Sequence, residues 1–249
     1  MAIEDFELCI RPNPNLTIWR YINLKKFESM LKEKALFFCR VDRFPDPFEG
    51  SIPRRIAENR DESLKDTKIL SNAHQLFRKK HIVNCWHINN NENDFMWKLY
   101  LKSNEGVAIK TTVRKLLDSF SKTSETVFCS KVRYLDYENS TWFNEVEYPF
   151  KAYNLFIPLI HKRIEFKQEE EIRLISEIDT NIDDYDIYWN QQLNQNGKNI
   201  HLDIKNLIKT IYTHPACDNR QLNDIKRIIA KYNYNFNVIK SKLSNEPYY

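Results

Sequence analysis

Apolar residues recur along the chain at two different spacings, and together they predict a mixture of strands and helices. Residues 16–22 and 35–41 are short apolar runs that are typical of strands. The residues between them repeat apolar side chains at helical spacing behind Asn23, a residue type that caps helix N-termini. This part of the sequence therefore predicts a strand, a helix and a second strand in succession.

The same two spacings continue through the middle of the chain. Three prolines and a glycine mark residues 42–56 as a loop, and residues 57–80 form a polar stretch that is expected to be helical. Strands are expected at residues 81–88, 105–111 and 127–137, and helices at residues 93–100, 111–120 and 148–163.

The stretch EFKQEEEIRLIS, residues 165–176, sets three consecutive acids beside Arg173 in an apolar frame. At a spacing of two, apolar residues fall on one face, and Glu169, Glu171 and Arg173 fall on the other. At helical spacing, Glu169 and Arg173 would instead form an i,i+4 pair on an exposed helix. The residue before Glu169 is not a helix-capping type, so a half-buried strand over residues 170–176 is the preferred interpretation.

The end of the chain is expected to add to a core that precedes it. Residues 177–199 are acidic and rich in Asn, which predicts a surface insertion, and residues 221–236 carry apolar side chains at helical spacing. The irregular alternation of helices and strands is typical of an α+β fold with a mainly antiparallel sheet and flanking helices. We expect a core domain over residues 1–180, with the insertion and C-terminal helices of residues 181–249 packed on it.

Composition excludes several classes of protein. The chain has 249 residues, enough for one large core or two small ones, and its three glycines cannot build a G-x-G-x-x-G turn or a phosphate-binding glycine loop. Its five cysteines include no C-x-x-C pair, which argues against a disulfide framework and a zinc ribbon. We therefore expect neither a Rossmann nor a P-loop fold, and a reducing, cytoplasmic setting fits best.

Charge and hydropathy limit the partners. The N-terminus carries acids and prolines in place of a basic and then apolar signal, and no apolar run approaches the length of a membrane span, so we expect no membrane partner. The net charge of +4 is unevenly placed, since residues 201–249 hold eight Lys and Arg against four Asp and Glu. Such a bias usually marks a solvated face, and contact of this basic C-terminal part with a protein or nucleic acid is the less common alternative.

Three stretches hold residues that could carry chemistry, and each also has a plain structural explanation. In FPDPFEG, Asp46 and Glu49 could face a site, or Asp46 could only bond the backbone of a turn. In NCWHINNNENDFMWKLY, aromatic residues could form a pocket wall around His87, or could only pack in the core. The charged residues at 169–173 could form a site or an ion-pair ladder on a surface strand, which would contribute little.

The motifs FPDPFEG, MWKLY followed by GVAI, and KRIEFKQEEEIRLI occur in an order and at a spacing that resemble a prokaryotic family, domain of unknown function 2971. The resemblance runs from about Trp19 to Arg173. This chain departs from the family at Pro45, where Asn is usual, and at Ile172, where an aromatic residue is common. The family's activity is not settled, so the resemblance implies a fold and a site but no reaction. The family pattern falls on Arg20, Tyr21, Asp46, Pro47, Phe48, Glu49, Met96, Trp97, Tyr100, Gly106, Glu169, Glu171 and Arg173.

The first functional hypothesis is an NAD-using enzyme similar to ADP-ribosyltransferases, acting in phage defence or as a toxin. Such domains have a split α+β sheet, an early strand with Arg and a late Glu-x-Glu, which Arg20 and Glu169-x-Glu171 resemble; their middle Ser-Thr-Ser element is missing here. A carboxylate beside the ribose would stabilise positive charge, and an arginine would hold a phosphate. NAD would bind in a cleft as a substrate, and no metal is expected. This hypothesis makes Glu171 and Glu169 catalytic and assigns substrate binding to Arg20, Tyr21, Asp46, Glu49, Trp97, Tyr100 and Arg173.

Two hypotheses from other classes stay open. A metal-dependent nuclease could gather oxygen ligands around magnesium from Asp46 and Glu49 and from Glu165 with Lys167, or Glu169 with Glu171. A non-catalytic module could instead bind or sense a small ligand. The three hypotheses differ in which side chains converge. Arg20 on the same side as Glu171, across a cleft lined by Trp97 or Tyr100, favours NAD, and Asp46, Glu49 and Glu169 within metal-ligand distance favour the nuclease. A satisfied ion-pair cluster with no cleft favours the binding module.

Overall fold

A computed structural model of the whole chain describes residues 3–4, 9–63, 67–141, 156–178 and 195–249. Its helices are α1 (Leu24–Glu33), α2 (Arg54–Ser63), α3 (Thr67–Lys80), α4 (Asp94–Tyr100), α5 (Val113–Asp118), α7 (Ile204–Leu207) and α8 (Asn219–Lys231), and its 3₁₀ helices are Val41–Arg43, Ile157–Ile160, Ile164–Glu169 and Lys242–Ser244. Its strands are β1 (Ile3–Glu4), β2 (Thr17–Asn23), β3 (Ala35–Arg40), β4 (His81–Ile88), β5 (Gly106–Thr112), β6 (Val127–Lys131), β7 (Arg133–Leu135), β8 (His161–Arg163), β9 (Glu171–Glu177), β10 (Gly197–His201), β11 (Thr210–Thr213) and β12 (Val238–Ile239).

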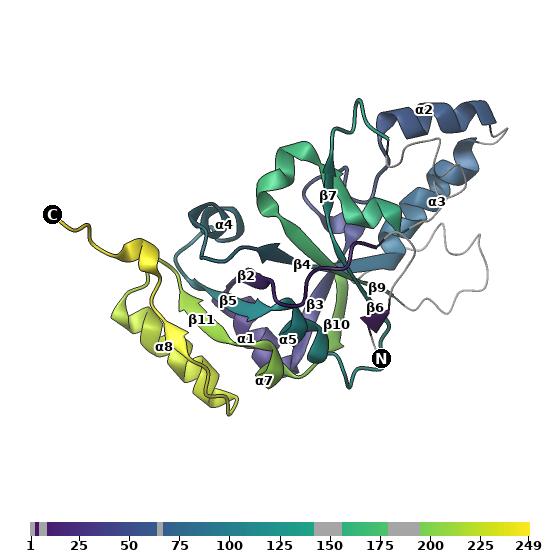
Figure 1. Cartoon of the computed structure of the whole chain (residues 1–249). Coiled ribbons are helices and arrows are strands. Elements are labelled where there is room, and N and C mark those ends of the chain that lie inside the picture. Colours follow the sequence, from purple (N-terminus) through teal and green to yellow (C-terminus); the bar gives the residue numbers. More distant parts are fainter. Residues whose placement is uncertain (1–2, 5–8, 64–66, 142–155, 179–194) are drawn as a thin grey trace.

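One large, mostly antiparallel sheet runs through the molecule (Figure 1), so the α+β fold expected from the sequence is confirmed. Its strands follow the order β1-β6-β9-β4-β2-β5-β11-β12, and β3 and β10 form a second branch that also starts from β4. Only the edge pairs β1–β6 and β11–β12 are parallel within it. A separate two-stranded sheet joins β7 and β8.

The large sheet divides along one edge of β4. Through Ile88 and His87 that edge pairs with β2, and through Val83 and Ile82 it pairs with β3. Within the described part of the chain, no ladder pair joins residues 84–86 to either strand. A gap therefore opens between β2 and β3 in the middle of the sheet.

Side chains satisfy the backbone groups that this gap leaves without ladder partners. The Arg20 guanidinium donates from Nη1 to the carbonyl oxygen of Cys85, and Asn84 donates from Nδ2 to the carbonyl oxygen of Phe37 at 2.9 Å. Buried backbone groups need such partners, since an unpaired one costs about as much as a lost hydrogen bond. The gap is thus a stable feature of the fold, and we refer to it as the split.

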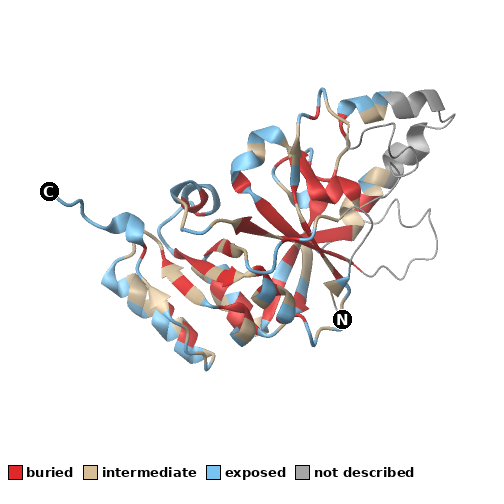
Figure 2. Cartoon of the chain, viewed as in Figure 1, coloured by how far each residue is buried: buried red, intermediate tan, exposed pale blue. Residues whose placement is uncertain are grey.

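Helices cover both faces of the sheet (Figure 1). Those on one face, α1, α5, α7 and α8, bury Phe27, Leu31, Val113, Leu116, Ile204, Leu207, Ile225 and Ile229 against the strands. On the other face, α4 covers an aromatic cluster of Trp19, Tyr21, Met96 and Trp97, and α3 helps to cover a second cluster of Val41, Phe77, Val83, Leu159 and Ile175. Buried residues therefore follow the strands, and exposed residues follow the outer sides of the helices (Figure 2).

Local sequence explains the helix that bridges the two branches. Asn23 caps α1 by accepting a hydrogen bond from the Lys26 backbone at 2.9 Å, as expected from the sequence, and Lys34 ends it with a φ of 50°. Its buried residues Phe27, Met30 and Leu31 lie on one face. Because α1 connects β2 directly to β3, it crosses the split on one side of the sheet.

Two of the secondary-structure elements expected from the sequence are wrong. Residues 127–137 were expected to be one strand but form β6 and β7, which belong to different sheets. Residues 148–163 were expected to be a helix; residues 148–155 lie outside the described residues, and the rest forms the 3₁₀ helix Ile157–Ile160 and β8. The parallel pairing of β8 with β7, a long-range contact, overrides the local helical pattern.

The C-terminal part is more deeply involved in the sheet than the sequence indicated. The insertion expected at residues 177–199 lies mostly outside the described residues, but its end is part of β10, which pairs with β3. The strands β11 and β12 extend the β2 branch. The sequence assigned the core to residues 1–180, yet three strands from residues 181–249 are hydrogen-bonded into the same sheet. No helix of the described part has the length and apolar character to cross a bilayer.

Candidate functional site

A buried cluster of charges lies where β9 begins. Glu171 and Arg173 alternate with Ile172 and Leu174, so they leave β9 on the face opposite the large core. The sequence predicted a half-buried strand, but both faces of β9 are buried. Glu169 was expected to lie on the same strand; it ends a 3₁₀ helix instead, and Glu170, with a φ of 39°, turns the chain into β9.

Lys162, on β8, holds three carboxylates together. Its Nζ lies 2.7 Å from Oε1 of Glu171, 2.9 Å from Oε2 of Glu169 and 3.1 Å from Oε1 of Glu49. The lysine side chain is only 6% exposed. Sequence reasoning missed Lys162, because it lay in a segment expected to be helical and nothing in the pattern set it apart from the surface lysines.

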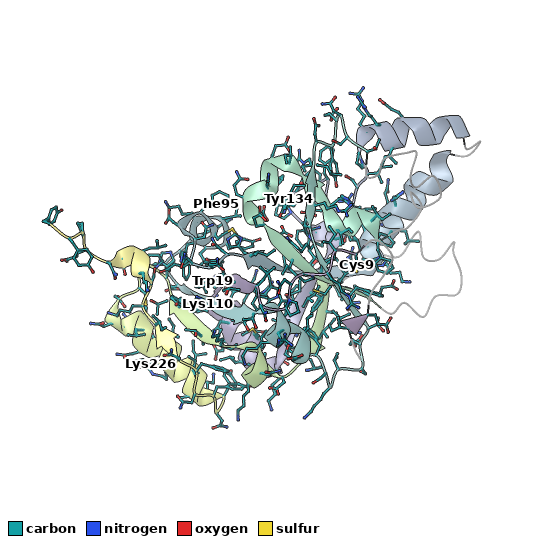
Figure 3. All side chains as sticks on the ribbon, in the orientation of Figure 1. Cys9, Trp19, Phe95, Lys110, Tyr134 and Lys226 are labelled. Atoms are coloured by element: carbon teal, nitrogen blue, oxygen red, sulfur yellow. The ribbon has the colours of Figure 1, made fainter. Side chains whose placement is uncertain are left out.

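Arg173 fixes the same carboxylates from the other side. Its Nε lies 2.8 Å from Oε2 of Glu171, and its Nη2 lies 2.9 Å from Oε2 of Glu49. Its Nη1 donates to the carbonyl oxygen of Leu159 at 2.9 Å, so the buried guanidinium is well bonded. Tyr134, labelled in Figure 3, accepts a hydrogen bond through its hydroxyl from the Glu171 backbone N–H at 2.9 Å, which fixes the start of β9.

The cluster pushes the pKa values of its two acids apart. Burial alone would raise the pKa of Glu171, but Arg173 and Lys162 outweigh it and hold that pKa well below its ordinary value. Burial, together with a hydrogen bond to Glu171, raises the pKa of Glu169 to about 7. Near neutral pH the site thus holds one fixed carboxylate beside one carboxyl group that can gain or lose a proton, the arrangement expected of acid–base pairs.

A cavity of about 500 Å³ occupies the split and reaches this cluster. It is large enough for a small-molecule ligand. Its lining includes Arg20, Tyr21, Tyr100, Glu169 and Glu171, which the sequence proposed for the site, and His87, which it proposed as part of a pocket. The hydroxyl of Tyr100 lies 3.4 Å from Oε2 of Glu169, so this aromatic residue borders the carboxyl group directly.

Arg20 enters the cavity from the opposite face of the sheet, so it does not lie on the same side as Glu171, as the NAD hypothesis expected. It alternates with Trp19 and Tyr21 on β2 and so leaves the strand on the side of α1. Burial lowers the pKa of Arg20, and its guanidinium carbon lies 5.9 Å from the centre of the Trp86 ring. In the described part of the chain no carboxylate pairs with Arg20, which leaves a charged group in a cavity without a counterion.

The other residues proposed for substrate binding, Asp46, Glu49, Trp97 and Arg173, are not among the lining residues of the cavity. Asp46 pairs with Arg163 at 2.7 Å and accepts a hydrogen bond from the Phe48 backbone, as a turn residue does. Glu49 binds Lys162 and Arg173 as described above. Trp97 is 1% exposed and packs edge-on against Tyr21, with ring centres 4.9 Å apart.

His87 positions Glu169 through the backbone. Its Nδ1 lies 2.7 Å from the carbonyl oxygen of Glu169, and its Nε2 lies 3.3 Å from Nδ2 of Asn93. Burial lowers the pKa of His87, so the ring is neutral at neutral pH. A neutral ring donates from Nδ1 and accepts at Nε2, which fits both neighbours.

The carboxylates converge on a lysine. Glu49, Glu169 and Glu171 all point at the Lys162 ammonium, and the described residues contain no group of three or more His, Cys, Asp or Glu side chains arranged to hold a metal ion. Glu165 and Lys167, which the nuclease hypothesis invoked, are exposed. A buried ammonium therefore occupies the place where these acids meet.

Comparison with known proteins gives a match in the part of the chain that supplies much of the site. No curated protein matches the chain. The segment from α4 to β9, which supplies Tyr100, Lys162, Glu169, Glu171 and Arg173, matches a family model. Residues 96–174 are thus identified as a match to the family described as "Protein of unknown function (DUF2971)", the family that the motifs predicted.

Proposed function

We propose that the protein is an NAD-using, ADP-ribosyltransferase-like enzyme that binds the dinucleotide in the split and breaks the bond between its ribose and nicotinamide. One observation carries the proposal: a single cavity brings Arg20, which has no carboxylate partner among the residues that the structure describes, together with the acids Glu169 and Glu171. The cavity thus offers a cation for phosphate and a carboxylate for a sugar in one space.

Arg20 is suited to bind the diphosphate of the ligand. A guanidinium that is partly desolvated and has no carboxylate partner gains most from an anionic ligand, and arginine binds phosphate oxygens in a bidentate manner. One of its nitrogens already donates to Cys85, which fixes the orientation of the group before a ligand arrives.

Glu171 is suited to stabilise the sugar when its bond to nicotinamide breaks. When the bond from C1′ to the nicotinamide nitrogen breaks, its electron pair leaves with nicotinamide and C1′ becomes oxocarbenium-like. A carboxylate that stays ionised stabilises that positive charge, and the low pKa of Glu171 keeps it ionised. Both of its oxygens already contact Lys162 or Arg173, and one also bonds to Glu169, which leaves an acceptor site on the other oxygen for a ribose hydroxyl.

Glu169 is suited to the second half of the reaction. A nucleophile, either water or a side chain of a target, forms the new bond to C1′ and releases a proton. A carboxylate whose conjugate acid has a pKa of about 7 accepts that proton well near neutral pH. The rate should therefore rise with pH up to about 7 and level off above it.

The buried Lys162 argues for this proposal over the nuclease. Three carboxylates that each contact an ammonium within about 3 Å already have their counterion, and a magnesium ion would have to displace it. A non-catalytic module would use the same cavity, so turnover decides between binding and catalysis.

The test is release of nicotinamide from NAD by the purified protein, followed by chromatography. We expect release by the wild type, and at least a 100-fold loss in Glu171→Gln and Arg20→Met when circular dichroism shows both to be folded. Glu165→Gln, an exposed acid in the neighbouring 3₁₀ helix, is the matched control and should keep full activity. Full activity in folded Glu171→Gln would refute the catalytic role, and saturable NAD binding without release would identify a binding module.

A further inference from the structure

The cavity extends past Arg20 to a second group of positive charges. Lys25, Lys26 and Ser29, from the first turns of α1, also line it, and α1 packs on the face of the sheet opposite the one on which Glu171 leaves β9. These residues follow β2 directly in the chain, so α1 carries them over the split. We propose that Lys25 and Lys26, together with Arg20, form a phosphate subsite that binds the phosphate-bearing end of the ligand and sets its direction in the split.

The two lysines are available for a ligand. Neighbouring charged residues of α1 already have partners, since Lys32 lies 3.3 Å from Glu33 and Glu28 lies 2.8 Å from Lys231. By contrast, no ion pair among the residues that the structure describes includes Lys25 or Lys26. Uncompensated positive charge is therefore confined to the part of α1 that lines the cavity.

The positive charges lie close enough to act together. Cys39 on β3 also lines the cavity: burial raises the pKa of its thiol, Lys26, Arg40 and Arg20 act to lower it, and Asp42 acts to raise it. Lys26 and Arg20 thus act on one point inside the cavity. A phosphate group beside Cys39 would experience the same two charges, and they attract an anion in addition to any hydrogen bonds they donate.

The cluster around Glu171 carries no excess of positive charge. Lys162 and Arg173 balance Glu49 and Glu171, and Glu169 adds a negative charge as the pH rises through about 7, so phosphate is favoured at α1 over this cluster. A ligand with phosphate at one end and a sugar at the other would therefore bind in one direction, with its sugar beside Glu171. This direction rests on the proposed function, whereas the subsite itself does not, since it requires only an anion.

The subsite is tested by calorimetric titration with inorganic pyrophosphate and, separately, with ADP-ribose. The variant is the double substitution Lys25→Gln and Lys26→Gln, and the matched control is Lys32→Gln, on the same helix but away from the cavity. We expect both ligands to bind the double variant about tenfold more weakly than the wild type at about 50 mM salt, with a smaller difference at about 300 mM. The control should bind as the wild type does.

The outcomes separate this inference from the proposed function. Equal affinity of wild type and double variant for pyrophosphate, an equal loss in Lys32→Gln, or no binding of pyrophosphate to the wild type at millimolar concentration would each overturn the subsite. Lysine-dependent pyrophosphate binding in a protein that does not release nicotinamide from NAD would support the subsite and refute the enzyme. Nicotinamide release from NAD that is unaffected in the double variant would support the enzyme and refute the subsite.

Discussion

Glu169→Gln should change how the stability of the protein depends on pH. The substitution keeps the shape of the side chain and an oxygen for Lys162, but it removes the ionisable group. In the folded protein the pKa of Glu169 is raised from 4.5 to about 7, and its side chain is 8% exposed. At roughly 1.4 kcal/mol per pKa unit, the rise corresponds to about 3 kcal/mol of folding free energy.

The sign follows from which state holds the proton. Between pH 4.5 and 7, Glu169 is protonated in the folded chain and ionised in the unfolded chain. The stability contributed by this group is therefore fully present below pH 4.5 and is lost as the pH rises to about 7. The wild type should lose about 3 kcal/mol over this range relative to Glu169→Gln, because the variant has no proton to release.

Urea denaturation of both proteins at half-unit steps from pH 4.5 to 8.5 measures this difference directly. We expect the free energy of unfolding of Glu169→Gln, minus that of the wild type, to grow by about 3 kcal/mol up to pH 7 and then to stay level. Glu165→Gln, an exposed acid in the same 3₁₀ helix, should show a difference within about 0.5 kcal/mol throughout. A constant difference for Glu169→Gln would refute the raised pKa and the role of Glu169 as a base.

Two further predictions test the architecture. Arg173→Met removes a positive partner from the buried Glu49 and Glu171, so it should lower the free energy of unfolding by about 3–5 kcal/mol, measured by urea denaturation. Arg54→Met, whose ion pairs are exposed, is the control and should lower it by at most about 1 kcal/mol. Equal losses in the two variants would contradict the buried cluster. Gly197→Ala places a Cβ 2.0 Å from the carbonyl oxygen of Phe38, so it should lower stability by more than about 1 kcal/mol, and a neutral effect would contradict the pairing of β10 with β3.

Local patterns were sufficient for much of the fold. The capped helix after Asn23 and the strands at residues 81–88 and 105–111 follow from spacing and capping alone, and the structure contains all three. The Glu-x-Glu pair and Arg20 could also be proposed, because charged residues inside apolar runs are rare enough to be noticed. These features depend on residues that are neighbours in the sequence.

The parts that the sequence did not predict depend on long-range contacts. Lys162 joins the site because β8 pairs with β7, a contact between segments that are far apart in the chain. The left-handed conformation of Glu170 separates Glu169 from β9, and nothing in a run of three glutamates indicates which one turns the chain. The split, finally, arises from where β2 and β3 each stop pairing with β4, which periodicity does not encode.

The most direct test of the account is a crystal structure of the protein with ADP-ribose, at a concentration that saturates binding in solution. We predict density in the split between β2 and β3, with the phosphates beside Arg20 and the ribose carbon C1′ facing Glu171. Density at another place on the chain, or a split left empty at that concentration, would contradict the assignment of this cavity as the nucleotide site.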